Sequence, residues 1–91
     1  MAQHNLNAVI KICEMDQEMK DFAIETGIQA AQSKSTEQEI ASHVKKTFEE
    51  RYQPSWHCIV GRNFGAHVTF EAKNYIYFYI GQMGLLLFKS A

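Results

Sequence analysis

The chain has 91 residues, 46% of them hydrophobic and 21% charged, and its formal net charge at pH 7 is -1. This length accommodates one folded domain, over residues 1–91, and leaves no room for two separate cores. The near-neutral charge provides no attraction to nucleic acid or to an anionic membrane, and no apolar run reaches the roughly 18 residues of a membrane-spanning helix.

The first part of the chain is predicted to form a strand and then a helix. Residues 8–12 alternate weakly, as a first strand does, and Asp16 has a suitable side chain for the N-cap of the helix. Gly27 lies inside this helix at a cost of about 1 kcal/mol relative to alanine, and we expect close packing to be the reason. The buried stripe of the helix is predicted to consist of Met15, Met19, Phe22, Ala23, Thr26 and Ala30.

A second helix is predicted after the break at residues 33–35. Ser35 or Thr36 caps it, because each is followed three residues later by the Gln or Glu of a capping box. The helix must end before Pro54, since the residue before a proline avoids the helical conformation. Its apolar residues recur every four positions, at Ile40, Val44, Phe48 and Tyr52.

Two short strands are predicted next, at residues 56–60 and 64–70, with residues 61–63 between them. The second strand alternates cleanly between two faces and contains Gly65, which lets another backbone approach. It is therefore a candidate sheet edge. An edge has to be covered, paired within an oligomer or used to bind an extended peptide. We interpret this one as both a dimer contact and a binding surface.

The last two strands, predicted at residues 75–80 and 83–88, are apolar on both faces, and Gly81-Gln82 forms the turn between them. Two helices can cover one face of a small sheet but not two. The second face therefore needs a cover from outside the chain, and a second copy is the simplest one. The predicted fold class is α+β, with two helices packed on an antiparallel β-sheet in a homodimer.

Several stretches carry a resemblance to a known family. The run Pro-Ser-Trp-His-Cys-Ile-Val-Gly-Arg-Asn-Phe-Gly occupies residues 54–65, and it is followed by Ile76-Tyr77-Phe78-Tyr79, Gly81-Gln82 and Leu86-Leu87-Phe88-Lys89-Ser90. From Ala8-Val9-Ile10-Lys11 onward, the chain strongly resembles the eight-kilodalton cytoplasmic dynein light chains. The length of the chain and the order of its segments agree with that family.

The resemblance implies a strand-swapped homodimer with two identical peptide grooves at its interface. Three tyrosines of the 75–80 strand line one wall of a groove, and residues 63–70 of the other chain form the opposite, hydrogen-bonding edge. Glu37 and the N–H groups that begin the second helix match the place where the family holds a ligand glutamine. The implied peptide-binding residues are Lys11, Glu37, Gln38, Asn63, Phe64, Gly65, Ala66, His67, Val68, Thr69, Phe70, Tyr75, Tyr77 and Tyr79, with Gly84 and Leu86 at the floor. The implied dimer contacts are His57, Phe64, His67, Thr69 and Ser90.

The resemblance also implies a non-catalytic subunit of the dynein motor on the microtubule cytoskeleton, without a cofactor. Its partners would be the dynein intermediate chain and other disordered segments that carry Thr-Gln-Thr-like motifs. The sequence departs from the family at three places that bear on ligand preference. Phe70 replaces a histidine, Ala66-His67 replaces Ser-Tyr, and Gln38 replaces a lysine.

Catalytic and metal sites are not favoured by the sequence. His57 and Cys58 are adjacent on a strand and point to opposite faces, so they cannot act as a base and nucleophile pair. His43 or His67 could approach Cys58, but nothing in the sequence orients either of them as a triad would, and no ligand pair has zinc-site spacing. Cys13 and Cys58 are predicted to be buried thiols of a reducing compartment. The lack of a signal-peptide layout also predicts a cytoplasmic protein.

Two alternative functions stay open beside the peptide-binding one. Residues 62–70 share part of an RNA-binding strand motif, but they lack its first glycine and have Ala66 where a stacking aromatic belongs. Without a basic excess, RNA binding is the weaker alternative. The other is a structural oligomerisation subunit without general peptide binding, which titration with Thr-Gln-Thr peptides would distinguish.

Overall fold

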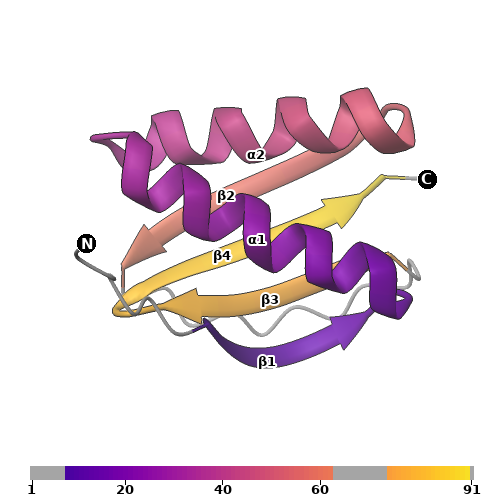
Figure 1. Cartoon of the computed structure of the whole chain (residues 1–91), viewed down its shortest axis with the longest axis horizontal. Coiled ribbons are helices and arrows are strands. Elements are labelled where there is room, and N and C mark those ends of the chain that lie inside the picture. Colours follow the sequence, from indigo (N-terminus) through magenta and orange to yellow (C-terminus); the bar gives the residue numbers. More distant parts are fainter. Residues whose placement is uncertain (1–7, 63–73, 91) are drawn as a thin grey trace, which may run out of the picture.

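The computed structural model describes residues 8–62 and 74–90, which form a four-stranded antiparallel sheet with two helices across one face (Figure 1). The elements are β1 (Ala8–Glu14), α1 (Gln17–Ser33), α2 (Glu37–Tyr52), β2 (Trp56–Arg62), β3 (Tyr75–Ile80) and β4 (Met83–Lys89). The strand order is β1-β3-β4-β2, so the β3–β4 hairpin lies in the middle of the sheet. The predicted α+β fold is confirmed, and the predicted exchange of a strand between two copies concerns residues outside the described ranges.

Helix α1 begins where predicted and packs closely through its glycine. The Asp16 side chain caps the helix by accepting a hydrogen bond from the Met19 N–H at 2.9 Å. A Cβ atom on Gly27 would lie 2.8 Å from Cζ of Phe78, so glycine is what lets α1 approach β3 this closely. The predicted buried stripe is confirmed at Ala23, Thr26 and Ala30, whereas Met15, Met19 and Phe22 are only partly buried.

Helix α2 begins with the predicted capping box, and its N-cap is Thr36 rather than Ser35. The Thr36 hydroxyl accepts the Glu39 N–H at 3.1 Å, and the Glu39 carboxylate accepts the Thr36 N–H, also at 3.1 Å. The Thr36 hydroxyl also donates to the Glu39 carboxylate at 3.1 Å, and this hydrogen bond, followed by the one from the Thr36 N–H, lowers the pKa of Glu39. The helix ends at Tyr52, before Pro54 as predicted. Its apolar face is buried at Ile40, Val44 and Phe48 and partly buried at Tyr52.

The hydrophobic core lies between the sheet and the helices. Phe78 of β3 pairs with Leu85 of β4, and both side chains are fully buried. The Trp56 ring packs edge-on against Phe48, with centroids 4.8 Å apart. The largest fully buried side chains are Trp56, Phe48, Phe78, Ile76, Leu85, Leu87 and Val44. Because alternate strand residues point to opposite faces, the residues between these form a second face turned away from the helices.

The predicted strands agree with the structure except at their ends. β3 has the predicted bounds, and β1 and β4 extend beyond their predicted ends to Glu14 and Lys89. Residues 61 and 62 were predicted as a connection and are instead part of β2. The prediction was wrong because Gly61 pairs with Gly84 and Arg62 with Met83, so the ladder with β4 continues. The predicted strand at residues 64–70 lies outside the described residues.

Candidate functional site

The sheet face turned away from the helices, here called the outer face, carries most of the described site residues. Neither α1 nor α2 lies on this face (Figure 1). Across the sheet, Ile59 pairs with Leu86 and Leu86 with Tyr77, so these three side chains form one row. By the same register, the outer-face residues of β2, β3 and β4 are His57, Ile59, Gly61, Tyr75, Tyr77, Tyr79, Gly84, Leu86 and Phe88. The predicted tyrosine wall and the predicted Gly84–Leu86 floor therefore share one surface.

Two tyrosines of β3, Tyr77 and Tyr79, contact each other, and Tyr79 also contacts Lys11. The Tyr77 hydroxyl donates a hydrogen bond to the Tyr79 hydroxyl at 3.0 Å, and the two ring centroids are 5.5 Å apart. Burial, together with this hydrogen bond, raises the pKa of Tyr77 to about 12. The Lys11 ammonium lies 5.9 Å from the centroid of the Tyr79 ring, within cation–π range. The structure thus places three of the predicted peptide-binding residues in contact.

A cavity of about 430 Å³ lies at the end of the sheet where α2 begins. Glu37 of α2 and Arg62 of β2 both line it, with Oε2 and Nε 3.9 Å apart. Both side chains are well exposed, so this ion pair contributes little to stability. The other lining residues are Ala31, Lys34, Ser35, Ile40, Ile80, Gln82 and Met83. The cavity therefore combines apolar walls with a carboxylate and a guanidinium.

The first turn of α2 adds hydrogen-bond donors beside this cavity. The Glu39 N–H donates to Thr36, while the N–H groups of Glu37 and Gln38 have no acceptor within the described ranges. The Gln38 side chain is exposed and does not line the cavity. The cavity includes Ile80, which faces the helices, whereas the tyrosines lie on the outer face. A single chain therefore does not bring the cavity and the tyrosine wall into one site.

His57, a predicted dimer contact, is exposed in the single chain. Its ring stacks on Phe88, with the centroids 5.3 Å apart and the planes at 30°. The neighbouring outer-face residue Ile59 is 50% exposed. Exposed and partly exposed aliphatic and aromatic groups that lie side by side, as His57, Phe88 and Ile59 do, are typical of a protein–protein contact.

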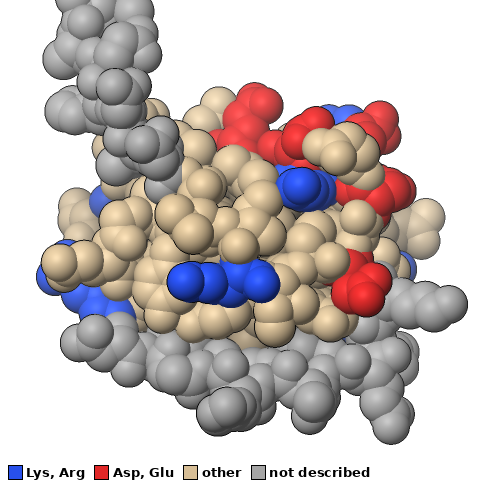
Figure 2. Space-filling model, turned by 90° about the horizontal axis from the view of Figure 1, so that it is seen from below, with Lys and Arg blue, Asp and Glu red and all other residues tan. Residues whose placement is uncertain are grey.

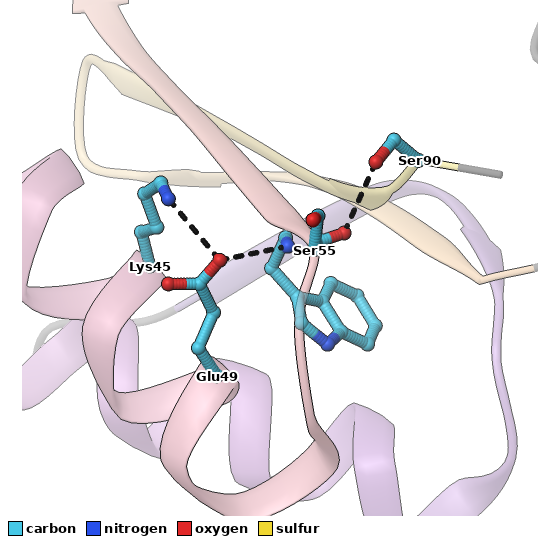
Figure 3. A network of polar contacts seen from close by, with 5 residues as sticks. Lys45, Glu49, Ser55 and Ser90 are labelled. Carbon is cyan, nitrogen blue, oxygen red and sulfur yellow. Dashed lines mark hydrogen bonds and ion pairs between the residues drawn. The ribbon is translucent and has the colours of Figure 1, made fainter.

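Ser90, the other described dimer candidate, is held at the start of β2. Its N–H donates to the Ser55 carbonyl oxygen at 3.0 Å, and its hydroxyl donates to the same oxygen at 3.4 Å (the latter shown in Figure 3). At the next residue, the Trp56 N–H donates to Glu49 at 3.2 Å, and Glu49 also accepts from Lys45 at 3.1 Å (Figure 3). Both hydrogen bonds lower the pKa of Glu49. Ser90 is thus half-buried and tied to the point where α2, β2 and β4 meet.

The predicted hydrogen-bonding edge falls outside the described residues, together with three of the predicted dimer contacts. It consists of Asn63, Phe64, Gly65, Ala66, His67, Val68, Thr69 and Phe70. Two of the three departures from the family pattern are in this segment, so their effect on ligand preference stays a prediction.

Three exposed apolar residues of the outer face were not among the predicted site residues. Val9 is 53% exposed, Ile12 43% and Ile59 50%. Val9 pairs with Tyr79 and Ile12 with Tyr77, so both flank the tyrosine wall. For Val9 and Ile12, the only indication in the sequence was the apolar character of residues 8–12. A register shift between Ile10 and Ile12 hid which face each side chain takes.

The described residues carry no activated thiol and no group of three or more His, Cys, Asp or Glu that could hold a metal ion. Burial raises the pKa of the Cys58 thiol to about 12 and also raises that of Cys13. Both thiols therefore stay protonated at neutral pH, where a nucleophile or metal ligand has to be a thiolate. Neither described helix is long and apolar enough to cross a membrane.

Comparison with known proteins agrees with this geometry. The family model for dynein light chain type 1 matches residues 7–90. The dynein light chain-like domain of the Fasciola hepatica calcium binding protein FhCaBP2 has 18% identity and a TM-score of 0.80, over 97% of this chain and 95% of that one. The DLC-like domain of CsTAL3 has 15% identity and a TM-score of 0.77, over 91% and 92% of the two chains. These structures share the fold, and because the family model spans nearly the whole sequence, the chain belongs to the dynein light chain family.

Proposed function

We propose that this chain is a non-catalytic, homodimeric light chain of the dynein motor that binds short linear peptides by β-strand addition. Two copies exchange the strand at residues 64–70 and form two identical grooves at their interface. The protein acts in the cytoplasm, on the microtubule cytoskeleton, without a cofactor. Its partners are the dynein intermediate chain and other disordered segments with Thr-Gln-Thr-like motifs.

The observation that carries the proposal is the apolar outer face, on which neither helix packs. Ile59 is 50% exposed there, and His57 is exposed beside Phe88. Tyr77 and Leu86 of this face are already buried, so the apolar surface left in water is mainly that of Ile59 and its neighbours, and its burial would contribute roughly 25 cal/mol per Å². A second copy related by a two-fold axis presents the same apolar surface. A homodimer built on the outer face is therefore favoured.

The groove would combine one copy's tyrosine wall with the partner's exchanged strand. Tyrosine provides an apolar wall with a polar tip, and main-chain hydrogen bonds to the exchanged strand would fix the register of the ligand. A ligand glutamine would find the Glu37 carboxylate and the N–H groups of the first turn of α2. The cavity of about 430 Å³ beside them has room for such a side chain.

Two grooves on one dimer would join two copies of a partner. Once the first copy is bound, the second is held nearby, and its effective concentration is set by the tether between them. Such a protein acts as a dimerisation hub, because it holds two disordered chains side by side even where each peptide binds weakly to its own groove.

Calorimetric titration with a Thr-Gln-Thr peptide, combined with sedimentation equilibrium, tests the proposal. We expect one bound peptide per chain and a mass of two chains. Glu37→Gln should weaken binding severalfold, because it removes the carboxylate at the cavity. Glu50→Gln is the matched control, since Glu50 is an exposed residue of the same helix. A monomeric protein that takes up no peptide would contradict the proposal.

The same outer face also favours a second candidate, a structural oligomerisation subunit without general peptide binding. This candidate predicts the same dimer mass, because it uses the same apolar surface. It differs in the calorimeter, where Thr-Gln-Thr peptides would release no heat of binding at any accessible concentration.

A further inference from the structure

Strand β1 contains one residue more than its partner needs. Ile10 pairs with Phe78, but Ile12 pairs with Tyr77, so Lys11 is inserted between two consecutive pairs of the ladder. This is a β-bulge, which bends a strand and changes the direction of the side chains that follow it. Without the extra residue, Ile12 would stand opposite Ile76, whose side chain is fully buried under the helices.

The bulge moves Ile12 from the helix-covered face to the outer face. Ile12 is 43% exposed beside Tyr77, and Val9 is 53% exposed beside Tyr79. Cys13 instead takes the place opposite Ile76, where burial raises the pKa of its thiol. We call Val9, Lys11 and Ile12 the β1 strip. It extends the tyrosine wall onto the outermost strand with two branched aliphatic side chains.

The charged side chain of the β1 strip is the basic residue Lys11, and no acidic residue among those the structure describes forms an ion pair with it. The Lys11 ammonium lies against the Tyr79 ring and forms no ion pair with any of residues 8–62 or 74–90. Seen from the β1 side, the molecule presents a largely uncharged surface crossed by a basic side chain, and acidic groups gather toward one end (Figure 2). An incoming carboxylate would therefore meet an available cation beside the apolar side chains.

We propose that the β1 strip is an additional subsite of the peptide groove, selecting a branched aliphatic ligand residue with an acidic residue two positions away. Residues two apart in an extended peptide lie on the same face, so both can reach the strip together. The inference rests on the proposed peptide-binding function, because the strip is continuous with Tyr77 and Tyr79.

A bound peptide fits the strip better than a second folded copy does. A stable protein–protein interface buries roughly 1,200–2,000 Å² in total, far more than three side chains can supply. One aliphatic side chain and one carboxylate match the two chemistries present. The strip therefore determines which peptide is preferred, while His57 and Ile59 of β2 and Phe88 of β4 support the dimer.

Calorimetry with guest residues in a host peptide tests the subsite. The host carries a Thr-Gln-Thr core with alanine on both sides, and isoleucine is placed at each flanking position in turn. At the best position we expect affinity to rise by about tenfold over alanine, from burial of the aliphatic side chain. Aspartate two positions from that isoleucine should add about a twofold to fivefold gain that salt removes.

Substitutions on β1 then assign the gain to particular residues. Ile12→Thr keeps the β-branched shape but removes apolar surface, and it should abolish most of the isoleucine gain. Ile10→Thr is the matched control, since Ile10 is the same residue type on the same strand but pairs with the buried Phe78. Lys11→Gln should abolish the aspartate gain and leave the isoleucine gain in place.

The outcomes separate this inference from the function on which it rests. If the alanine host binds but no guest position improves affinity, or if Ile12→Thr retains the whole gain, the subsite is refuted and peptide binding stands. If no peptide binds the unaltered dimer, both are refuted. Circular dichroism of each variant shows whether the fold is kept, and the host affinity of the control Ile10→Thr should stay within about twofold of the parent.

Discussion

Gly27 and Phe78 approach so closely that a Cβ atom on the glycine would lie 2.8 Å from Cζ of the ring. Helix propensity alone would favour alanine at position 27 by about 1 kcal/mol. Overpacking of a close contact typically costs about 1–3 kcal/mol, and Phe78 is fully buried and cannot move away. We therefore expect Gly27→Ala to lower the free energy of unfolding by about 1 kcal/mol, and Gly27→Val by more, in urea titrations at fixed protein concentration.

Gln32→Ala is the control for this prediction, because Gln32 is exposed in the same helix. It should leave stability unchanged or raise it slightly, as alanine is the better helix former. A Gly27→Ala protein that is more stable than the parent would mean that the ring yields to the added methyl group.

Stability in alkaline solution should depend on Tyr77. Burial and the hydrogen bond with Tyr79 raise its pKa from 10.0 to about 12. The unfolded chain has the ordinary pKa and loses the proton first, so the free energy of unfolding falls as pH rises from 10 toward 12. We expect the urea midpoint of the parent to fall more steeply over this range than that of Tyr77→Phe, which has no hydroxyl proton to lose.

Measurement at pH 8 provides the reference for this comparison, because the Tyr77 hydroxyl is then protonated in both states. The difference between parent and variant there reports the lost hydroxyl contacts alone. Equal slopes for the two proteins between pH 10 and pH 12 would show that Tyr77 does not cause the alkaline loss.

Cys58 should react with alkylating reagents far more slowly in the folded protein than in the unfolded one. Burial raises its pKa from 9.0 to about 12, which corresponds to about a thousandfold less thiolate at pH 8. In a Cys13→Ser variant, which leaves Cys58 as the only thiol, iodoacetamide should therefore label the folded protein far more slowly than the urea-unfolded one. Mass spectrometry measures both rates. Labelling of the folded variant at the unfolded rate would exclude a buried thiol.

A charge at His57 should weaken the proposed dimer. His57 stacks on Phe88 in the outer face, which two copies would bury against each other. Lysine keeps its charge and must stay in water, so we expect His57→Lys to raise the dissociation constant of the dimer by about a hundredfold. Sedimentation equilibrium measures this constant. Gln29→Lys, which adds the same charge at an exposed position of α1, should have no effect. A His57→Lys variant that dimerises as tightly as the parent would place the interface elsewhere.

The helix ends were predictable because their signals are local. Asp16 and Thr36 supply oxygens to the first turns of their own helices, so no distant residue takes part. The close packing at Gly27 was predictable too, since an interior glycine needs a reason. Its partner Phe78 was not, because the sheet brings it there from the other end of the chain.

The candidate site was predictable where the strand alternation is regular. Tyr75, Tyr77 and Tyr79 occur at every second position, and the register confirms that they share a face. The bulge at Lys11 was hidden, because one inserted residue leaves the composition unchanged and only pairing with β3 reveals it. The Glu37–Arg62 ion pair was not predicted, because a Gly-Arg-Asn sequence is typical of a turn. In the structure, pairing with β4 keeps Arg62 within the sheet.

The central position of the β3–β4 hairpin constrains when the protein can fold during its synthesis. Every ladder of the described sheet includes β3 or β4, yet these two strands are translated after β1, α1, α2 and β2. The helices can form on the ribosome, because their hydrogen bonds are local, but their apolar faces then have no sheet to cover. Until the hairpin emerges, the nascent chain keeps its core side chains exposed. A ribosome that pauses between β2 and β3 would therefore leave this protein in the state most prone to capture by chaperones or to aggregation.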